Sequence, residues 1–288
     1  MRLVTFATKK GSAVGLREGD YIIDLSLAAR KLPHSLAEIL AAGASARALI
    51  RKAADKPKAK ALLKASKVKL LPPIPNPGKI VCVGLNYKDH AAETGNPLPT
   101  YPVIFTRFTS TLVPHGRKML APKASQMLDY EAELAVVIGK RGRNIPKDKA
   151  LRHVGGYSCF NDGSVRDYQA KTSQFTLGKN FDGTGGFGPD LVTPDELPEG
   201  AHGLRIMCRL NGQTLQDGTT ADLVFDVASL IAEISTVMTL EPGDVIITGT
   251  PAGVGMARNP KIFMKPGDVC EVEIEGIGTL RNPIAQGA

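Results

Sequence analysis

The sequence lacks the features that would place it in a membrane or a secreted compartment. No apolar run approaches the roughly 20 residues of a membrane-spanning helix. The first residues, 1–6, contain no apolar core of a signal peptide. Cysteine is scarce and scattered, without a C-x-x-C pair, so disulfides and structural zinc are not expected. We therefore expect a cytoplasmic globular protein with no membrane partner.

Nucleotide and nucleic-acid binding also find no support in the sequence. The glycine-rich loop 249–255 is not closed by Gly-Lys-Ser/Thr, and no G-x-G-x-x-G opens a helix. The net charge is +8, but residues 51–69 alone hold eight lysines and arginines against one aspartate. That stretch has no aromatic residue, which favours a solvated helix and linker over a nucleic-acid surface.

Proline marks a boundary in the chain. Residues 71–78 contain four prolines, which exclude regular structure there. We predict a small N-terminal α+β domain over residues 1–70 and a larger domain over 71–288. In the first, strands are expected within 1–25, and helices at 36–40 and 46–54.

The larger part is predicted to be mainly β. Short apolar, β-branched segments bounded by glycine or proline indicate strands at 79–84, 102–107, 128–139, 154–160, 205–215 and 245–248, and again after residue 268. Residues 109–126 look irregular. One strong helix begins after Asp226, with apolar residues at helical spacing. The fold class is therefore α+β.

Two glutamates stand at i and i+2 in the strand predicted at 128–139. Side chains alternate along a strand, so Glu131 and Glu133 share a face with Cα atoms about 6.5 Å apart. Carboxylates this close repel each other unless a cation lies between them. Asp162, at the end of the next strand, is placed to be a third oxygen ligand. The alternatives are a polar strand face in water and ordinary turn chemistry.

A short helix after residue 86 carries His90 and Glu93 on one face. A carboxylate beside an imidazole fixes its tautomer and raises its basicity, which makes a general base. An exposed i,i+3 pair without function is an equal alternative.

Two further cationic residues follow. Arg166 and Gln169 would share a face of a short helix capped by Ser164, where an arginine suits capture of a substrate carboxylate. Lys179 is the one lysine of the glycine-rich loop 177–189.

Together these segments resemble the fumarylacetoacetate hydrolase superfamily over roughly residues 70–285. The resemblance rests on five separated motifs in the same order: Asn86-Tyr87-x-Asp89-His90-x-x-Glu93, Tyr130-Glu131-x-Glu133-Leu134, Asn161-Asp162-x-x-x-Arg166-Asp167-x-Gln169, Gly178-Lys179-x-Phe181-Asp182 and Thr248-Gly249-Thr250-Pro251-x-Gly253-Val254-Gly255.

The resemblance implies a mixed β-sandwich roll, usually a homodimer. Glu131, Glu133 and Asp162 would hold Mg²⁺ or Mn²⁺ beside a small-molecule 2-oxo acid. His90 and Glu93 would lie on a lid helix and activate water, and Lys179 would stabilise developing negative charge. Substrate contacts would come from the following residues: Arg166, Gln169, Thr250, Tyr87 and Arg107.

The implied activity is a Mg²⁺-dependent, catabolic hydrolase that cleaves a C–C bond in acylpyruvate-type 2,4-diketo acids. Oxaloacetate decarboxylation and isomerisation or decarboxylation of a hydroxydienedioate remain open on the same site. A binding module without activity is disfavoured because every motif residue is present. Two departures concern the acyl pocket: Arg107 stands where many relatives have lysine, and residues 183–186 replace a proline-containing loop.

Overall fold

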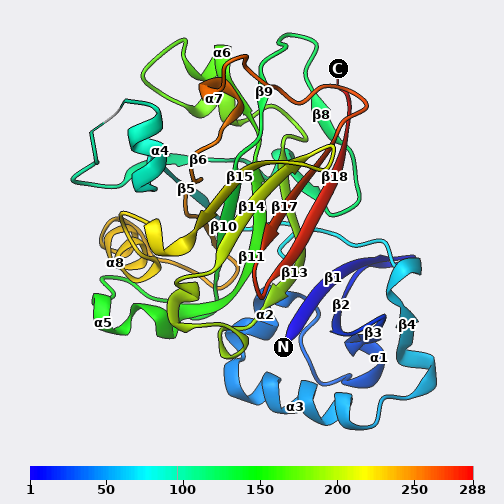
Figure 1. Cartoon of the computed structure of the whole chain (residues 1–288). Helices are drawn as coiled ribbons and strands as arrows, with labels where there is room; N and C mark the ends of the chain where they lie inside the picture. The colour runs from blue at the N-terminus through cyan, green and yellow to red at the C-terminus, as the bar shows by residue number, and fades with distance from the viewer. Residues whose placement is uncertain (96, 288) are drawn as a thin grey trace.

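Two β-sheets pack face to face (Figure 1). The computed structural model describes residues 1–95 and 97–287. As predicted, the fold is mainly β with a few short helices. The strands are mixed in direction, since β5–β16, β7–β13 and β8–β18 pair in parallel and the other pairs are antiparallel.

The larger sheet runs through both parts of the chain. Its order is β4-β3-β2-β1-β13-β11-β10-β16-β5-β6, with β7 joined to β13 at the side. Its strands are β1 (Arg2–Thr8), β2 (Gly11–Glu18), β3 (Tyr21–Asp24), β4 (Leu62–Lys64), β5 (Ile80–Gly84), β6 (Val103–Thr106), β7 (Leu112–Pro114), β10 (Ala132–Ile138), β11 (Val154–Asp162), β13 (Gly185–Val192) and β16 (Val245–Ile247).

The second sheet has the order β15-β14-β17-β18-β8 and covers one face of β10, β11 and β13. Its first hairpin turns at Asn211-Gly212, where both residues have positive φ. The remaining strands are β8 (Met119–Ala121), β14 (Arg205–Leu210), β15 (Gln213–Thr219), β17 (Val269–Ile274) and β18 (Gly278–Gln286), and a separate pair, β9 (Leu128–Asp129) with β12 (Ser164–Val165).

Strand β10 is buried on both faces. Leu134 and Val136 lie in the core between the two sheets, whereas Ala135 and Val137 belong to the core beneath the N-terminal helices. Because Glu133 alternates with these residues, it lies on the same side as Ala135 and away from the second sheet. A half-exposed strand is therefore excluded for this segment.

The N-terminal region continues the larger sheet. Strand β1 pairs with β13 in the register Arg2↔Val192 and Leu3↔Leu191. Ser35 caps the second helix with the reciprocal Ser35–Glu38 capping box. A division of the chain at residue 70 stays a prediction. The helices here are α1 (Leu25–Ala28), α2 (Leu36–Ala41) and α3 (Gly43–Asp55).

The helices of the larger part are short except for the last. Asp226 caps α8 by accepting the Ser229 N–H at 2.7 Å, as predicted. The helices are α4 (Lys88–Glu93), α5 (Lys147–Ala150), α6 (Arg166–Gln169), α7 (Thr176–Lys179) and α8 (Val227–Val237). Single 3₁₀ turns occupy 59–61, 65–67, 109–111, 151–153, 194–196, 199–201, 220–222 and 255–257.

Three local predictions were wrong. Residues 109–126 are not wholly irregular, because β7 and β8 find partners that are distant in sequence. The strand predicted over 128–139 breaks at residues 130–131, where the chain leaves β9 and enters β10. Ser164 does not cap α6; its hydroxyl donates to the Asp162 carbonyl at 2.7 Å.

Candidate active site

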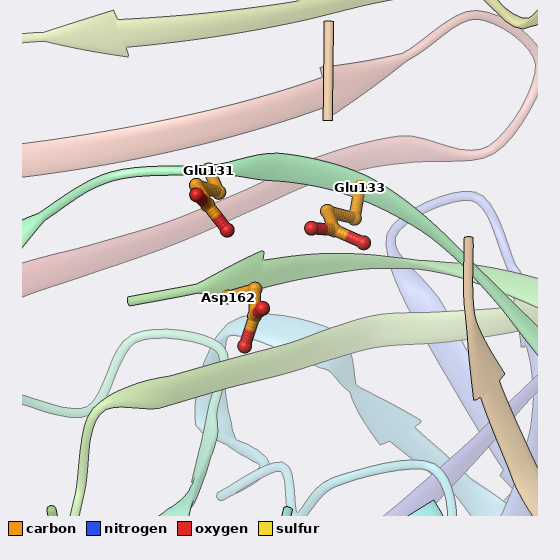
Figure 2. A group of neighbouring side chains, drawn as sticks. All are labelled: Glu131, Glu133 and Asp162. Atoms are coloured by element: carbon orange, nitrogen blue, oxygen red, sulfur yellow. The ribbon is translucent and has the colours of Figure 1, made fainter. Parts of the chain in front are cut away.

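Three buried carboxylates meet where β10 begins and β11 ends. Glu131 precedes β10, Glu133 lies within it, and Asp162 is the last residue of β11. The two segments are held in register because the Asp162 N–H donates to the Glu131 carbonyl at 2.9 Å. One oxygen from each carboxylate lies within 4.8 Å of the others, and Figure 2 shows them converging. The expected cluster therefore exists.

Cationic side chains compensate two of these carboxylates. The Lys179 ammonium, at the end of α7, bridges Glu131 at 2.5 Å and Asp162 at 2.6 Å. The Arg166 guanidinium lies 2.7 Å from the other Glu131 oxygen. Arg107 contacts the other Asp162 oxygen, the one that Lys179 does not contact. Glu131 and Asp162 thus each have two cationic partners.

Glu133 has no ion-pair partner among the described residues. One of its oxygens accepts the backbone N–H of Gly249 at 2.5 Å. Burial raises its pKa well above the usual range, and repulsion from Asp162 and Glu131 adds to the effect. By contrast, Lys179 and Arg166 outweigh burial at Glu131 and hold its pKa at about 2. The cluster therefore contains one carboxylate, Glu133, with which none of these three cations pairs.

This donor set fits a hard divalent cation. Three carboxylates with their oxygens close together are the ligands that Mg²⁺ and Mn²⁺ prefer. Lys179 remains charged beside them, because Asp162 and Glu131 outweigh its burial and raise its pKa. Glu131, Glu133 and Asp162 are thus the residues suited to hold the cation, with Lys179 at the border of the site.

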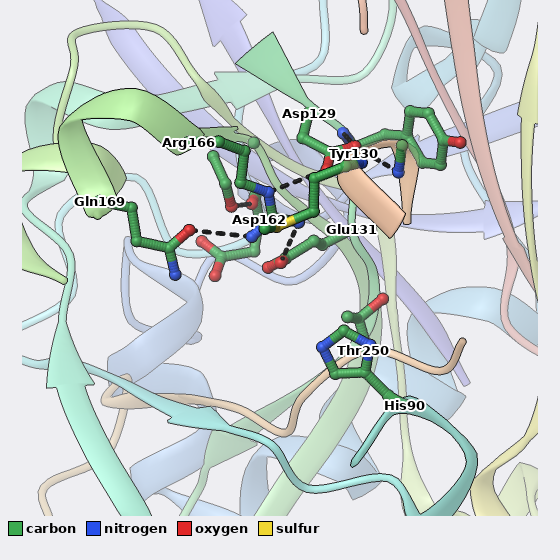
Figure 3. A network of polar contacts seen from close by, with 12 residues as sticks. His90, Asp129, Tyr130, Glu131, Asp162, Arg166, Gln169 and Thr250 are labelled. Atoms are coloured by element: carbon green, nitrogen blue, oxygen red, sulfur yellow. Dashed lines mark hydrogen bonds and ion pairs between the residues drawn. The ribbon is translucent and has the colours of Figure 1, made fainter. Parts of the chain in front are cut away.

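Asp129 is a central residue that the sequence reasoning missed. It is fully buried and accepts the Arg166 Nε–H at 2.8 Å. It also accepts the backbone N–H groups of Gly255 and Met256 at 2.8 and 2.9 Å. Arg166 in turn donates to the Gln169 side chain at 2.9 Å, as drawn in Figure 3. Asp129 thereby fixes both the arginine and loop 249–255; its place next to the Tyr130-Glu131 motif was the available signal.

The His90–Glu93 pair lies on α4, as expected. His90 is buried, and its Nδ1 lies 3.4 Å from a Glu93 oxygen. The other Glu93 oxygen accepts the Gly253 N–H at 2.9 Å, and Asp89 accepts the Ala252 N–H at 3.2 Å. In Figure 3 the His90 ring lies beside Thr250, below the Arg166–Glu131 pair. Both carboxylates of α4 therefore tie this helix to loop 249–255.

The remaining three site residues differ in their access to the site. Thr250 lines the cavity and accepts a hydrogen bond from Gln216 Nε2 at 2.7 Å. Arg107 is fully buried and donates to the Thr184 hydroxyl at 2.7 Å. It therefore links Asp162 to Thr184. Tyr87 is also fully buried, and its hydroxyl has no hydrogen-bond partner among the described residues. Substrate contact by Arg107 and Tyr87 stays a prediction, and neither is among the described lining residues.

A cavity of about 400 Å³ opens onto the carboxylates. Its lining combines the polar residues Glu131, Glu133, His90, Arg166 and Gln169 with aromatic and aliphatic side chains. Leu85, at the rim, has a φ of 53°, a conformation that non-glycine residues rarely adopt and that recurs at functional sites. The lining residues are Val83, Gly84, Leu85, His90, Thr94, Phe105, Glu131, Glu133, Arg166, Gln169, Ala170, Thr172, Phe175, Lys179, Thr250 and Met256.

A comparison with known protein families agrees with this geometry. The family described as fumarylacetoacetate (FAA) hydrolase C-terminal matches residues 79–285, which is most of the chain. The chain belongs to the fumarylacetoacetate hydrolase family. The family resemblance seen in the sequence motifs is thereby confirmed, and so is membership in a group of enzymes that includes hydrolases, isomerases and tautomerases.

Relatives in this family span the chain. Oxaloacetate tautomerase fahd2, mitochondrial, of Xenopus laevis is 43% identical over 99% of this chain and 90% of its own length. The fumarylacetoacetate hydrolase of Exiguobacterium antarcticum superposes with a TM-score of 0.85 at 35% identity, covering both chains fully. Maleylpyruvate hydrolase from Sphingobium sp. SYK-6, solved with manganese(II) and pyruvate, gives 0.83 at 28% identity, also over both full chains.

The structure bears on two further features, membrane-spanning helices and disulfides. Within residues 1–95 and 97–287, no helix is long and apolar enough to cross a membrane. All four cysteines are buried free thiols, including Cys208 and Cys270, whose sulfur atoms lie 3.6 Å apart. That no disulfide forms stays a prediction.

Proposed function

We propose that this enzyme is a Mg²⁺- or Mn²⁺-dependent hydrolase that cleaves the C–C bond of an acylpyruvate-type 2,4-diketo acid into pyruvate and a carboxylic acid. The observation that carries the proposal is the His90–Glu93 pair, in which His90 is buried and lines the same cavity as Glu131 and Glu133. A carboxylate-oriented imidazole is what activation of a water molecule requires. Tautomerisation or decarboxylation alone does not call for such a water.

Glu131, Glu133 and Asp162 would hold the cation. When bound, a divalent cation would act as a Lewis acid on the 2-oxo carboxylate of the substrate. His90 takes a proton from water, and Glu93 orients the ring and stabilises the imidazolium through the Nδ1 contact. The hydroxide adds to the distal carbonyl carbon, and the bond between that carbon and C3 breaks.

The electrons of the broken bond remain with pyruvate as its enolate. Lys179 offsets this negative charge, because its ammonium is buried and stays protonated beside two carboxylates. A proton then returns to C3 from His90, which took one from the water. Arg166 and Gln169 limit the movement of the carboxylate end, while Thr250 offers a hydroxyl to the substrate oxygens.

Oxaloacetate chemistry is the second candidate. It is favoured by the 43% identity with an oxaloacetate tautomerase over nearly the whole chain. Keto–enol exchange of oxaloacetate needs only the polarised 2-oxo acid and one acid–base group, both of which this site offers. Decarboxylation of oxaloacetate and isomerisation of a hydroxydienedioate use the same enolate and need no water.

The experiment is pyruvate release from acetylpyruvate and from oxaloacetate, side by side, with Mg²⁺ and with a chelator. The enol content of oxaloacetate is followed in parallel by ultraviolet absorbance. The hydrolase proposal requires that acetylpyruvate be cleaved faster and that the chelator stop the reaction. Faster turnover of oxaloacetate, in either assay, would replace the proposal with the second candidate.

The setting of the enzyme is part of the proposal. A catabolic role fits the products, pyruvate and a carboxylic acid. Free thiols suit a reducing compartment such as the cytoplasm, although the Xenopus relative is named mitochondrial. A homodimer is expected from the family resemblance, and size-exclusion chromatography with light scattering tests it directly.

A further inference from the structure

Part of the cavity wall is apolar. Val83, Leu85, Phe105, Phe175 and Met256 line it. The Phe105 and Phe175 rings meet edge to face, with centroids 5.8 Å apart and planes at 74°. Such a contact gives the wall a defined shape.

A glycine, Gly84, lies next to this apolar part of the wall. A Cβ built on Gly84 would lie 3.4 Å from the Phe175 ring and 3.7 Å from Val103, so a side chain there would enter the space beside Phe175. Gly84 ends β5, directly before Leu85. The absence of a side chain at Gly84 therefore leaves space next to the aromatic wall.

The two phenylalanines are positioned by elements that also build the cation site. Phe105 lies on β6 opposite Cys82 of β5. Phe175 precedes α7, the helix that ends at Lys179, and the Lys179 N–H donates to the Phe175 carbonyl at 3.2 Å. The Lys179 ammonium lies 5.1 Å from the centroid of the Phe105 ring. Lys179 thus lies next to both the carboxylates and the aromatic wall.

The cations at this cavity are already engaged. Among the described residues that line it, the permanently charged cations are Arg166 and Lys179. Arg166 is directed to Asp129, Glu131 and Gln169. Lys179 bridges Glu131 and Asp162. A second carboxylate on a substrate would therefore lie against aromatic and aliphatic groups without a cation to pair with, which is unfavourable.

We propose that the substrate carries an uncharged, apolar group at the end remote from its 2-oxo acid, selected by Phe105 and Phe175. This inference rests on the proposed function, since it names the acyl group of the 2,4-diketo acid that is cleaved. Burial of apolar surface favours such a group, at about fourfold in binding for each methylene. Acyl groups of several carbons or a phenyl ring are the matching class, and acyl groups ending in a carboxylate are disfavoured.

The first test is binding, which needs no turnover. With Mn²⁺ present, the full-length protein is titrated calorimetrically with 2-oxohexanoate and with 2-oxoadipate, which differ by a terminal methyl or carboxylate. We expect 2-oxohexanoate to bind at least 10-fold more tightly. Equal binding, or tighter binding of 2-oxoadipate, would overturn the inference.

Variants of Phe175 tie the preference to the aromatic wall. Phe175→Ala should lower the ratio of the two affinities about 10-fold, and Phe175→Arg, which adds a cation, should shift it toward 2-oxoadipate. Phe108→Ala is the matched control, because Phe108 is 57% exposed and is not among the described lining residues. A ratio that stays the same in both Phe175 variants would overturn the assignment of this wall.

Kinetics with acylpyruvates separate this inference from the proposed function. The expected order of kcat/KM is valeryl- or benzoylpyruvate above acetylpyruvate, with fumarylpyruvate last. If fumarylpyruvate is cleaved fastest, hydrolysis stands and the inference fails. If no acylpyruvate is cleaved but 2-oxohexanoate still binds more tightly than 2-oxoadipate, the proposed function fails while the apolar selectivity stands.

Discussion

Two groups of ion pairs in this protein use the same residue types in opposite surroundings. One is the buried cluster at the ends of β10 and β11. The other lies on the second sheet, where Arg209 contacts Glu271 and Glu273 at 3.2 and 2.6 Å and Arg281 contacts Glu271 at 3.4 Å. Side chains of this outer group are 22–53% exposed. We refer to these four residues as the outer ladder.

The difference lies in charge balance and in access to water. In the outer ladder two arginines face two glutamates, and solvent screens both. The buried cluster sets Asp129, Glu131, Glu133 and Asp162 against Arg107, Arg166 and Lys179. An unbalanced charge that is buried is costly, so this arrangement indicates a role that stability does not explain. The missing positive charge is what a divalent cation supplies.

The largest effect is expected from Glu133→Gln, which removes the carboxylate without an ion-pair partner. Metal-dependent turnover should fall more than about 100-fold, because a ligand is lost. In chelator the thermal unfolding temperature should not fall, since glutamine resembles the protonated acid that burial favours at this position. Glu273→Gln, in the outer ladder, is the control and should keep full turnover. Turnover retained by Glu133→Gln would remove the functional contrast between the two groups.

Loss of His90 should reduce hydrolysis while leaving the cluster intact. We expect His90→Ala to lower kcat for acylpyruvate cleavage by about 10²–10⁴-fold, as for removal of a general base. Mn²⁺ affinity, measured by calorimetry, should change little. The exposed His202→Ala is a matched control. An unchanged kcat in His90→Ala would exclude water activation by this residue.

Arg107 and Arg209 offer a direct comparison of stability. Arg107→Met leaves Asp162 buried without one of its partners, so the free energy of unfolding should fall by about 3–5 kcal/mol. Arg209→Met removes exposed pairs and should cost less than about 1 kcal/mol. Urea denaturation in chelator gives both values. Similar losses of unfolding free energy in the two variants would show that burial does not make the cluster's ion pairs stronger than those of the outer ladder.

The smallest effect is expected at His115, which is less buried than the cluster at β10 and β11 and is only partly exposed. Burial lowers its pKa, and the nearby Arg17 and Arg281 add to this, so the unfolded chain takes up the proton first. The stability contribution is present above the unfolded pKa near 6.5 and is lost as the pH falls through the lower folded value. Unfolding between pH 8 and 5 should therefore be less pH-dependent in His115→Gln than in the wild type. Identical pH profiles would contradict this.

The sequence predicts the local parts of the site. Glu131 and Glu133 share a face because of the strand period, Asp162 follows from a strand end, and His90 with Glu93 from helical spacing. The support of the site is non-local. Arg107 reaches Asp162 across 55 residues, and Asp129 receives N–H groups from residues more than 120 positions away. No period or spacing in the sequence indicates such contacts.

The larger fold shows the same limit. The strands of residues 1–25 are readable from their turns, yet the pairing of β1 with β13 joins residues 190 positions apart. Short strands such as β7 and β8 exist only because of distant partners. Their three residues carry too little pattern to be recognised alone.

The most direct test of this account is calorimetric titration of the metal-free protein with Mn²⁺ and Mg²⁺. We predict one site per chain, lost in Glu133→Gln and retained in Glu273→Gln. Absence of binding to the wild-type protein, or equal binding by Glu133→Gln, would contradict the claim that the excess buried carboxylate exists to hold a cation.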